Sequence, residues 1–427
     1  MVIVLTRRGI QGGNNGTGIS ILFQLRLVLG GSILLILWFS SSILQNDNPI
    51  FSDPVLGQDL GVRPSPIEVG DENKVSLQKT AAQPPASSHA TNGKHKLRFD
   101  WTNLPVQSKI AKLMLSHQNN CSLPLGNHSW RKKIFGLGSD LHVWGAALCN
   151  GIDDGHRIRT TNLKPWVWID QEKCDAETVD ASTLRCYFPH AEMQCPEDVS
   201  NVPRVRFNIS NPIHIKCDKT DSSPMNVFNK TDWRAAGVEL LFSRVATIVQ
   251  EEGERQLNLV FPNGVPNDLI TVHMRWGDKK FENRMMNISN TMKAIEKIRT
   301  QRRDNLQGPA SILLCTEDPK ATEAFLEAAP KNWKIYIDQF YHEMLPFRPK
   351  DESMYNIVPK VSRSLNGKPG LWALGSLLVA MEADAFVLVL SSNWSRIMDE
   401  LRRNVLNPRC QGCTYVVDVA EGKWKEW

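Results

Sequence analysis

The sequence predicts an α/β protein: a folded head built around a parallel, doubly wound sheet, preceded by an N-terminal transmembrane helix and a flexible stem. Three observations predict it. Beyond residue 256, short apolar runs alternate with amphipathic helical segments, as in a parallel sheet with helices on both faces. Residues 27–44 form an uncharged, mostly apolar run long enough to span a bilayer. Residues 45–96 are rich in Pro, Ser, Asn, Asp and Gly and cannot bury a core.

The charges around the apolar run predict its orientation. Residues 1–26 carry Arg7, Arg8 and Arg26 and no acidic residue, whereas Asp47 and Asp53 follow the run. By the positive-inside tendency, we expect a cytoplasmic tail at 1–26, an uncleaved signal anchor at 27–44 and a lumenal or extracellular remainder. A cleaved signal peptide is the alternative, but the run is long for that purpose and residues 40–42 form only a weak cleavage site.

Glycosylation sequons and cysteines agree with a lumenal head, because all nine cysteines and nearly all Asn-x-Ser/Thr triplets follow the apolar run. The lumenal sequons begin at Asn120, Asn127, Asn208, Asn229, Asn287 and Asn393. Disulfides are expected, in a pairing that the sequence does not fix, among Cys121, Cys149, Cys174, Cys186, Cys195 and Cys217.

The remaining cysteines have different expectations. Cys315 lies in an apolar run and is expected to be a buried free thiol. Cys410 and Cys413 have a spacing that zinc sites use, but no second pair accompanies them, which favours a disulfide or free thiols. The net charge of +5 comes with no Lys/Arg run of the kind that binds nucleic acid, so that partner is excluded.

The first half of the head, residues 97–255, contains a glycine turn that opens a helix. Gly136 and Gly138 allow a backbone to approach a ligand closely, and the first N–H groups of a helix attract phosphate. A strand is expected to begin near 156–159 and a helix to span 232–251. Between them lies an irregular, cysteine-rich region with His190 and His214. Either histidine could be catalytic, although structural histidines are more common.

The second half of the head, residues 256–427, carries the alternating pattern. Strands are expected at 269–272, 311–316, 333–338, 385–390 and 415–418. Helices are expected at 292–302, 319–329, 371–383 and 396–405.

Polar side chains follow three of these strands. They are His273, Arg275, Asp278 and Lys279 after the first strand, Glu317 and Asp318 after the second, and Ser391 and Ser392 after the fourth. Because the carboxyl ends of parallel strands meet at one edge of a sheet, we expect these side chains to converge on a ligand. Arg275 suits a phosphate, since its planar guanidinium offers parallel N–H donors and stays charged.

These residues lie in motifs that resemble those of a known superfamily. Residues 273–279, HMRWGDK, resemble the H-x-R-R-x-D-K motif of core α1,6-fucosyltransferases, and related H-x-R signatures occur in protein O-fucosyltransferases and nodulation fucosyltransferases. Residues 314–319 resemble the T-D-D-P strand end of that family, and 383–396 its A-D-(six apolar)-S-S-x-x-x-R stretch. Residues 135–142 resemble its G-x-G-x-Q-L-H loop. The four motifs occur in the expected order.

The resemblance implies a GT-B-like fold, with two facing Rossmann-like domains and GDP-fucose bound to the second. By position, Arg275 would hold the β-phosphate and stabilise the leaving group, while His273 would contact the nucleotide sugar. Asp278 and Lys279 would orient the active site, and Glu282 is the candidate base.

The same comparison places the rest of the donor site. Asp318, with Glu317 beside it, would bind the guanine. Ser392, next to Ser391, would donate a hydrogen bond to a phosphate. Gly138 and the N–H of Ser139 would face the phosphates from the other domain.

Three positions depart from the family pattern. Trp276 replaces the second arginine, Ser376 stands where an acidic residue is expected, and Asn283 stands where the glutamate is expected, with Glu282 one position early. The coiled-coil stem and C-terminal SH3-like domain of the core enzymes are not recognisable in the sequence.

The expected activity is inverting transfer of fucose from GDP-fucose to a glycan, including α1,6 on an N-glycan, or to a protein hydroxyl. The expected location is the Golgi or ER membrane, as a single-pass type II protein. Enzymes of this kind need no metal or other cofactor, and no D-x-D motif occurs here. Two alternatives remain: a transferase of the same fold with another nucleotide sugar, and an inactive membrane-tethered glycan-binding protein.

Overall fold

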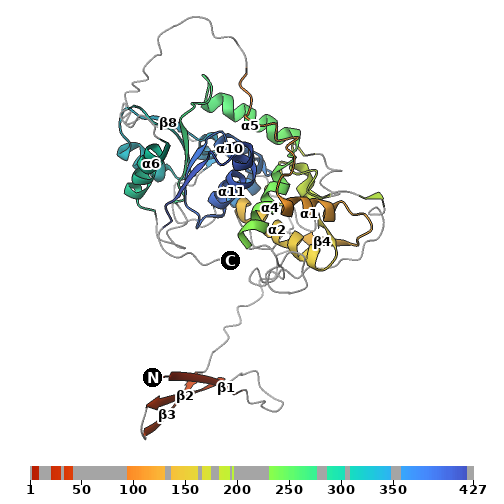
Figure 1. Ribbon diagram of the computed structural model, residues 1–427, viewed down its shortest axis with the longest axis vertical. Helices are drawn as coiled ribbons and strands as arrows, with labels where there is room; N and C mark the ends of the chain where they lie inside the picture. The colour runs from red at the N-terminus through yellow and green to blue at the C-terminus, as the bar shows by residue number, and fades with distance from the viewer. Residues whose placement is uncertain are drawn as a thin grey trace, which may run out of the picture. The chain divides into compact units, whose positions relative to one another are not determined.

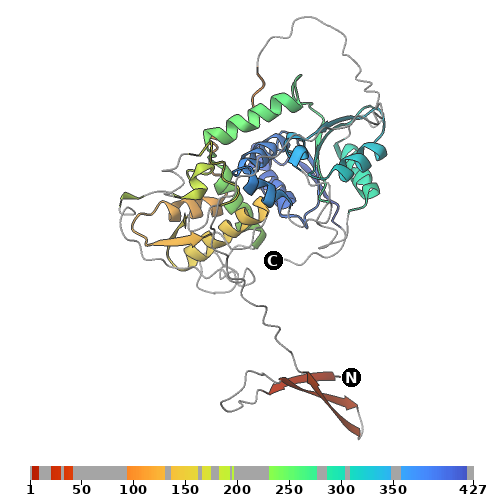
Figure 2. The ribbon, with the colours of Figure 1, turned by 180° about the vertical axis from the view of Figure 1, so that it is seen from behind.

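The chain forms two compact units, residues 1–87 and 88–427, which are described separately. The structure is a computed structural model (Figures 1 and 2). It describes residues 2–8, 21–29, 33–41, 94–129, 136–161, 166–174, 182–192, 195–196, 230–276, 286–302, 308–347 and 357–420.

The first unit differs from the helix expected at 27–44. Strands β1 (Val2–Arg8), β2 (Ile21–Leu29) and β3 (Ile33–Ser41) pair antiparallel in the order β1-β2-β3. A continuous apolar run has no period that separates helix from strand. Among the residues that the structure describes, no helix is long and apolar enough to cross a membrane. Most of the stem expected at 45–96 lies outside the described residues.

The second unit contains the predicted parallel sheet. Its strands are β6 (Leu269–His273), β7 (Ser311–Cys315), β8 (Lys334–Ile337), β9 (Ala385–Leu388) and β10 (Tyr415–Asp418), in the order β10-β9-β6-β7-β8. All four pairings are parallel. The first strand of this sheet, β6, is central. Strands β7 and β8 lie on one side of it, and β9 and β10 lie on the other. This is the doubly wound arrangement that the sequence predicts.

Helices cover both faces of this sheet (Figure 1). On one face, α6 (Ile288–Arg302) and α7 (Pro319–Ala328) pack through Ile295 and Phe325 on Val272 of β6. On the other face, α10 (Lys368–Ala380) and α11 (Asn393–Leu401) belong to the core that contains Leu313 and Phe386. Because neighbouring strand residues point to opposite faces, strands buried on both sides are apolar throughout.

The first half of the head is mainly helical among the residues described. Its elements are α1 (Lys109–Gln118), β4 (Leu125–Ser129), α2 (Leu137–Asp153), β5 (Arg157–Thr161), the 3₁₀ turn η1 (Thr183–Cys186), α4 (Lys230–Phe242) and α5 (Thr247–Val260). Strands β4 and β5 form a two-stranded parallel sheet. The boundary expected between residues 255 and 256 falls inside α5.

The single helix expected at 232–251 is interrupted. The backbone N–H of Val245 donates to the carbonyl of Trp101, and that of Ala246 donates to the carbonyl of Tyr187. These two amides therefore form hydrogen bonds with distant segments and not with the preceding helical turn. For this reason α4 ends before them and α5 begins after them. Local periodicity continues across the break and does not reveal it.

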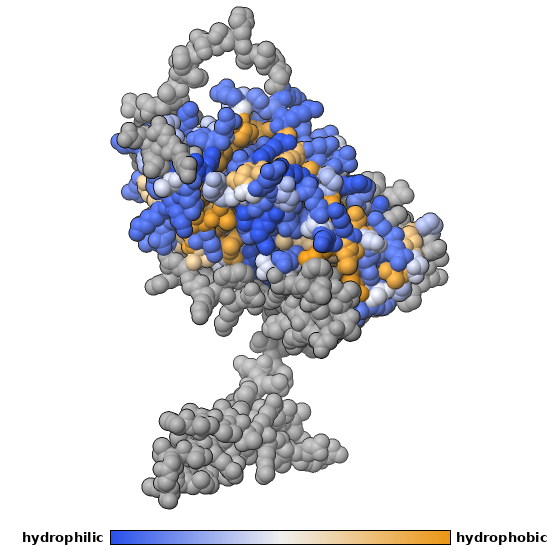
Figure 3. Space-filling view, viewed as in Figure 1, coloured by the Kyte–Doolittle hydropathy of each residue, from blue (hydrophilic) through white to orange (hydrophobic). Residues whose placement is uncertain are grey.

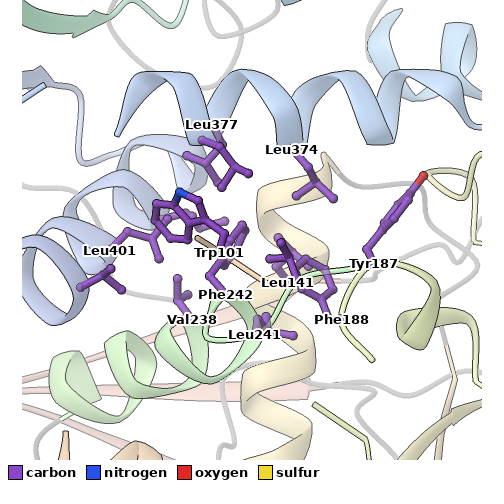
Figure 4. Packing of buried hydrophobic residues seen from close by; sticks show 14 of the residues in the cluster. Trp101, Leu141, Tyr187, Phe188, Val238, Leu241, Phe242, Leu374, Leu377 and Leu401 are labelled. Atoms are coloured by element: carbon purple, nitrogen blue, oxygen red, sulfur yellow. The ribbon is translucent and has the colours of Figure 1, made fainter. Parts of the chain in front are cut away.

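One hydrophobic core joins the two halves of the head. Trp101, Leu141 and Phe242 from the first half pack with Leu374 and Leu377 of α10 (Figure 4). The remaining elements are α8 (Gln339–Met344), the turn η5 (Leu345–Phe347), α9 (Ile357–Ser364), the π-helical turn η6 (Arg402–Leu406), and α12 (Asn407–Arg409). Most of the coloured residues on the molecular face in Figure 3 are hydrophilic, and the hydrophobic residues form smaller patches among them.

The cysteines that the structure describes follow the expectations, and Cys217 lies outside the described residues. Disulfides join Cys121 to Cys195, Cys174 to Cys186, and Cys410 to Cys413, and Cys149 is also disulfide-bonded. Cys315 is a buried free thiol at the end of β7.

Candidate functional site

The candidate site lies where the order of the strands reverses. Strands β6 and β9 are neighbours in the sheet, but the chain leaves β6 toward β7 and leaves β9 toward β10 on the other side. Ligands of doubly wound sheets bind beyond the carboxyl ends of the strands at such a point. The polar side chains that the sequence predicts to converge on a ligand lie in the segments directly after β6, β7 and β9.

Arg275 and Glu317 meet at this edge. Arg275 follows β6, Glu317 follows the neighbouring strand β7, and their side chains form an ion pair. The two side chains remain 21% and 23% exposed, so the pair lies at the surface of the site. A guanidinium has five N–H donors in a planar fork, and one carboxylate uses at most two of them. Arg275 can therefore contact Glu317 and an anionic ligand together.

His273 is buried at the end of β6 and is held by Ser395 of α11. Its Nδ1 lies 2.6 Å from the hydroxyl oxygen of Ser395, which also accepts the backbone N–H of Val389 at 3.0 Å. Burial, followed by the charge of Arg275, lowers the pKa of His273 to about 3, so the ring is neutral. A hydroxyl oxygen has two lone pairs, so this contact fits either tautomer of the ring; we assign the one in which the Ser395 hydroxyl donates to Nδ1 and the ring proton lies on Nε2.

Two helix N-termini lie side by side at the same edge. Ser392 precedes α11 and Gly136 precedes α2, and neither forms a side-chain cap hydrogen bond. The amide Nδ2 of Asn393 donates to the hydroxyl of Ser139 at 2.6 Å. A Cβ at Gly138 would lie 3.2 Å from the backbone nitrogen of Trp394, so a side chain there would press on the first turn of α11.

The two helices run in the same direction. Beyond the contact between their first turns, the ring of His142 on α2 lies 2.8 Å from the carboxylate of Glu400 on α11, and both side chains are buried. The contacts thus advance along both helices together, which places their positive ends next to each other. Helix N-termini attract anions through free N–H groups and the macrodipole.

Other predicted residues have local roles in the fold. The carboxylate of Asp318 accepts the backbone N–H of Lys320 at 2.9 Å and caps α7. The backbone N–H of Ser139 donates to the carbonyl of Gly136 at 2.9 Å, so its hydroxyl, and not its amide, faces the second half. Ser391 is partly exposed.

Several candidates are not brought to the site by the described part of the chain. Asp278, Lys279, Glu282 and His214 lie outside the described residues, and His190 is exposed in the first half. Among the described residues, no group of three or more His, Cys, Asp or Glu side chains is placed to hold a metal ion.

Two of the three positions that depart from the family pattern are accommodated in the fold, and the third, Asn283, lies outside the described residues. Trp276 packs against the core on the α6 face of the sheet. Ser376, on α10, donates to the buried carboxylate of Asp338 at 2.6 Å.

Sequence reasoning missed Ser395, His142 and Glu400 as parts of this arrangement. Ser395 lies one helical turn beyond the Ser391–Ser392 pair, and that spacing is the available signal for its nearness to the strand ends. His142 and Glu400 are 258 residues apart, and no local pattern connects them.

Neither a scan of the chain against protein-family models nor a search of curated proteins gave a match. The resemblance to fucosyltransferases therefore rests on the four motifs and their order.

Proposed function

We propose that the protein is a type II membrane glycosyltransferase that transfers fucose from GDP-fucose to a glycan or protein hydroxyl in the Golgi or ER lumen. The observation that carries the proposal is the arrangement of groups at the switch point of the sheet: Arg275 follows β6, α11 begins after the neighbouring strand β9, and the first turn of α2 is bonded to α11 through Ser139. These cationic and N–H groups match a diphosphate, and the motif resemblance narrows the class of donor.

Charge development explains what these groups would do. Cleavage of the bond between fucose and the β-phosphate leaves negative charge on GDP and an oxocarbenium-like sugar. Arg275 and the helix N–H groups are positioned before the reaction, so they stabilise that leaving group without having to reorganise. In the assigned tautomer, neutral His273 offers Nε2–H as a further donor.

The acceptor side involves residues beyond the described part of the chain. Glu282 is proposed to remove the proton of the acceptor hydroxyl, which attacks the anomeric carbon opposite the leaving GDP and inverts its configuration. Asp278 and Lys279 are proposed to orient these groups. The lumenal location is supported by the disulfides, which form in oxidising compartments, and by the basic residues before the apolar run.

The test is calorimetric titration of the full chain, purified in detergent, with GDP, GDP-fucose and other nucleotide sugars, followed by transfer of labelled sugar to glycan and peptide panels. Arg275→Ala is expected to lower turnover by about 10²–10³, as when one donor to a developing oxyanion is removed. Arg255→Ala is the matched control, since Arg255 forms its ion pairs with Glu252 and Glu343. If the wild-type chain bound neither GDP nor GDP-fucose in the titration, this donor would be excluded.

A second candidate is an inactive membrane-tethered glycan-binding protein. Trp276 in place of the family's second arginine favours it, because the site then lacks one of the cationic donors to the phosphates that the family pattern has. It predicts glycan binding without transfer or hydrolysis of any nucleotide sugar. Use of another nucleotide sugar by the same site would appear as transfer of a different labelled sugar.

A further inference from the structure

The fold treats three of the sequon asparagines, Asn120, Asn287 and Asn393, in two opposite ways. Asn120 lies exposed in the turn after α1. Its side-chain oxygen accepts the backbone N–H of Ser122 at 3.2 Å and the hydroxyl of Ser122 at 2.7 Å. The sequon serine is thus exposed and folded back onto its own asparagine oxygen, and no described residue bonds to the amide nitrogen.

Asn287 has the same arrangement at the start of α6. It is exposed, and its side-chain oxygen accepts the backbone N–H of Ser289, which is also exposed, at 2.9 Å. Its backbone carbonyl accepts the N–H of Asn290, so the sequon lies in the turn that opens the helix. Within the described part of the chain, the Asn287 amide nitrogen has no hydrogen-bond partner either.

Asn393 is the opposite case. Its amide nitrogen donates to Ser139 at 2.6 Å, and its oxygen accepts a guanidinium N–H of Arg396 at 3.1 Å. The serine of this sequon, Ser395, is fully buried and is bonded to His273. The amide of Asn393 is therefore used by the contact between the two halves of the head, and the Ser395 hydroxyl by a contact within the second half.

We propose that Asn120 and Asn287 are N-glycosylation sites and that Asn393 is not, although all three begin a sequon. An N-glycan is bulky and hydrophilic, and it needs an asparagine whose amide nitrogen points to solvent. A glycan on Asn393 would break the bond to Ser139 and would have to fit between the first turns of α2 and α11. The inference rests on the lumenal location in the proposed function, but not on its donor.

The modification is an oligosaccharide transfer. The Asn Nδ2 attacks the anomeric carbon of a saccharide carried on a lipid pyrophosphate. The bond from that carbon to the pyrophosphate oxygen breaks, the lipid pyrophosphate leaves with the electron pair, and an amide proton passes to a base of the host transferase. A glycosidic C–N bond replaces the C–O bond, and nothing is oxidised or reduced.

Occupancy can be measured on the full chain expressed in a eukaryotic cell with a working secretory pathway. Peptides are treated with a glycosidase that releases N-glycans in heavy-oxygen water, which converts each formerly glycosylated asparagine to ¹⁸O-labelled aspartate. Mass spectrometry is expected to find the label at positions 120 and 287 and unmodified asparagine at 393. The wild-type chain alone decides this, so no variant has to fold.

Two substitutions and their matched controls add a second readout. Ser122→Ala and Ser289→Ala each remove a sequon while keeping its asparagine, and each is expected to remove one glycan from the protein on a gel. Ser122→Thr and Ser289→Thr keep the sequon and are expected to keep the glycan.

Each other outcome overturns the assignment. A label at position 393, or its absence from 120 or 287 in a chain glycosylated elsewhere, contradicts the sites while leaving the lumenal location intact. A chain with no N-glycan at all contradicts both the sites and the lumenal location. Binding of GDP-fucose by the purified protein is measured separately, so the two proposals fail independently.

Discussion

The amide of Asn393 donates a hydrogen bond to the hydroxyl of Ser139 at 2.6 Å, although 254 residues separate them. Asn393 begins α11 after the sheet strand β9, and Ser139 lies in the first turn of α2, in the other half of the head. With the close approach of Gly138 to Trp394, this bond joins the two helix N-termini at the candidate site. Their relative position is therefore set by packing and exists before any ligand binds.

A double-mutant cycle measures this link. Ser139→Ala and Asn393→Ala are each expected to lower the free energy of unfolding by about 1 kcal/mol, the usual net value of such a hydrogen bond. The double variant is expected to lose less than the sum of the two, by about 0.5–1.5 kcal/mol, because both substitutions remove the same contact. Urea unfolding gives the values.

The control cycle pairs Ser139→Ala with Ser364→Ala, since the Ser364 hydroxyl donates to the carbonyl of Val361 within α9. That pair is expected to be additive. Additivity in the Ser139–Asn393 cycle as well would show that the two side chains do not interact in solution.

Ser395→Ala tests the assigned tautomer of His273. In the wild type, the ring is expected to carry its proton on Nε2 and to remain neutral from pH 5 to 8, because burial and the charge of Arg275 lower its pKa to about 3. Loss of the Ser395 hydroxyl removes the donor to Nδ1, and the ring is expected to populate both tautomers. The ¹⁵N chemical shifts of the ring nitrogens report this directly and do not depend on catalytic activity.

Ser362→Ala is the matched control, because the Ser362 hydroxyl donates to the carbonyl of Val167, away from His273. It should leave the ¹⁵N shifts of His273 unchanged. Unchanged shifts in Ser395→Ala would remove Ser395 from any role in positioning the ring.

The sequence predicted the features that depend on local pattern. The strand–helix alternation, the start of α7 at Pro319 and the convergence of Arg275 with Glu317 all follow from apolar runs, a helix-start signal and the shared edge of parallel strands. Gly138 was predicted to allow a close approach of a ligand, and in the structure it lies in the first turn of α2 and closely approaches Trp394 of α11.

The features that the sequence did not predict depend on distant parts of the chain. Ser395 forms a hydrogen bond with His273, which is 122 residues away. This contact can be recognised only once β6 and β9 are known to be neighbouring strands. The break between α4 and α5 depends on carbonyls of Trp101 and Tyr187. The strands at 21–41 come from an apolar run whose composition suits both helix and strand.

The disulfides allow a comparison of loop lengths. Cys121 and Cys195 are 74 residues apart, whereas Cys174 and Cys186 are 12 apart. If a disulfide acts mainly by restricting the unfolded chain, replacing the first pair by alanine should lower the free energy of unfolding by about 4 kcal/mol, and replacing the second by about 3 kcal/mol. Equal losses, or a larger loss for the short loop, would show that native contacts at the bridges dominate. Guanidinium unfolding of the two double variants gives the comparison.

A last prediction concerns the buried carboxyl of Asp338, which follows β8. Ser376 donates to it at 2.6 Å and the backbone N–H of Phe340 at 3.0 Å. These bonds favour the ionised form, but burial outweighs them and raises the pKa of Asp338 from 3.8 to about 6. From about pH 4 to 6 the unfolded chain loses this proton while the folded chain keeps it. The stability that Asp338 contributes therefore decreases as pH rises through this window and is constant above it.

Asp338→Asn removes this titration. The free energy of unfolding of the variant, relative to the wild type, is expected to rise from pH 4 to 6 by up to roughly 3 kcal/mol and then to level off. Glu382, whose pKa burial raises to about 7, is present in both proteins and cancels from the difference. Ser376→Ala should extend the fall in stability to higher pH, because the ionised carboxylate loses a donor and the pKa of Asp338 in the folded chain rises further. Urea unfolding at half-unit pH steps checks both variants, and a difference between Asp338→Asn and the wild type that does not change with pH would contradict a raised pKa.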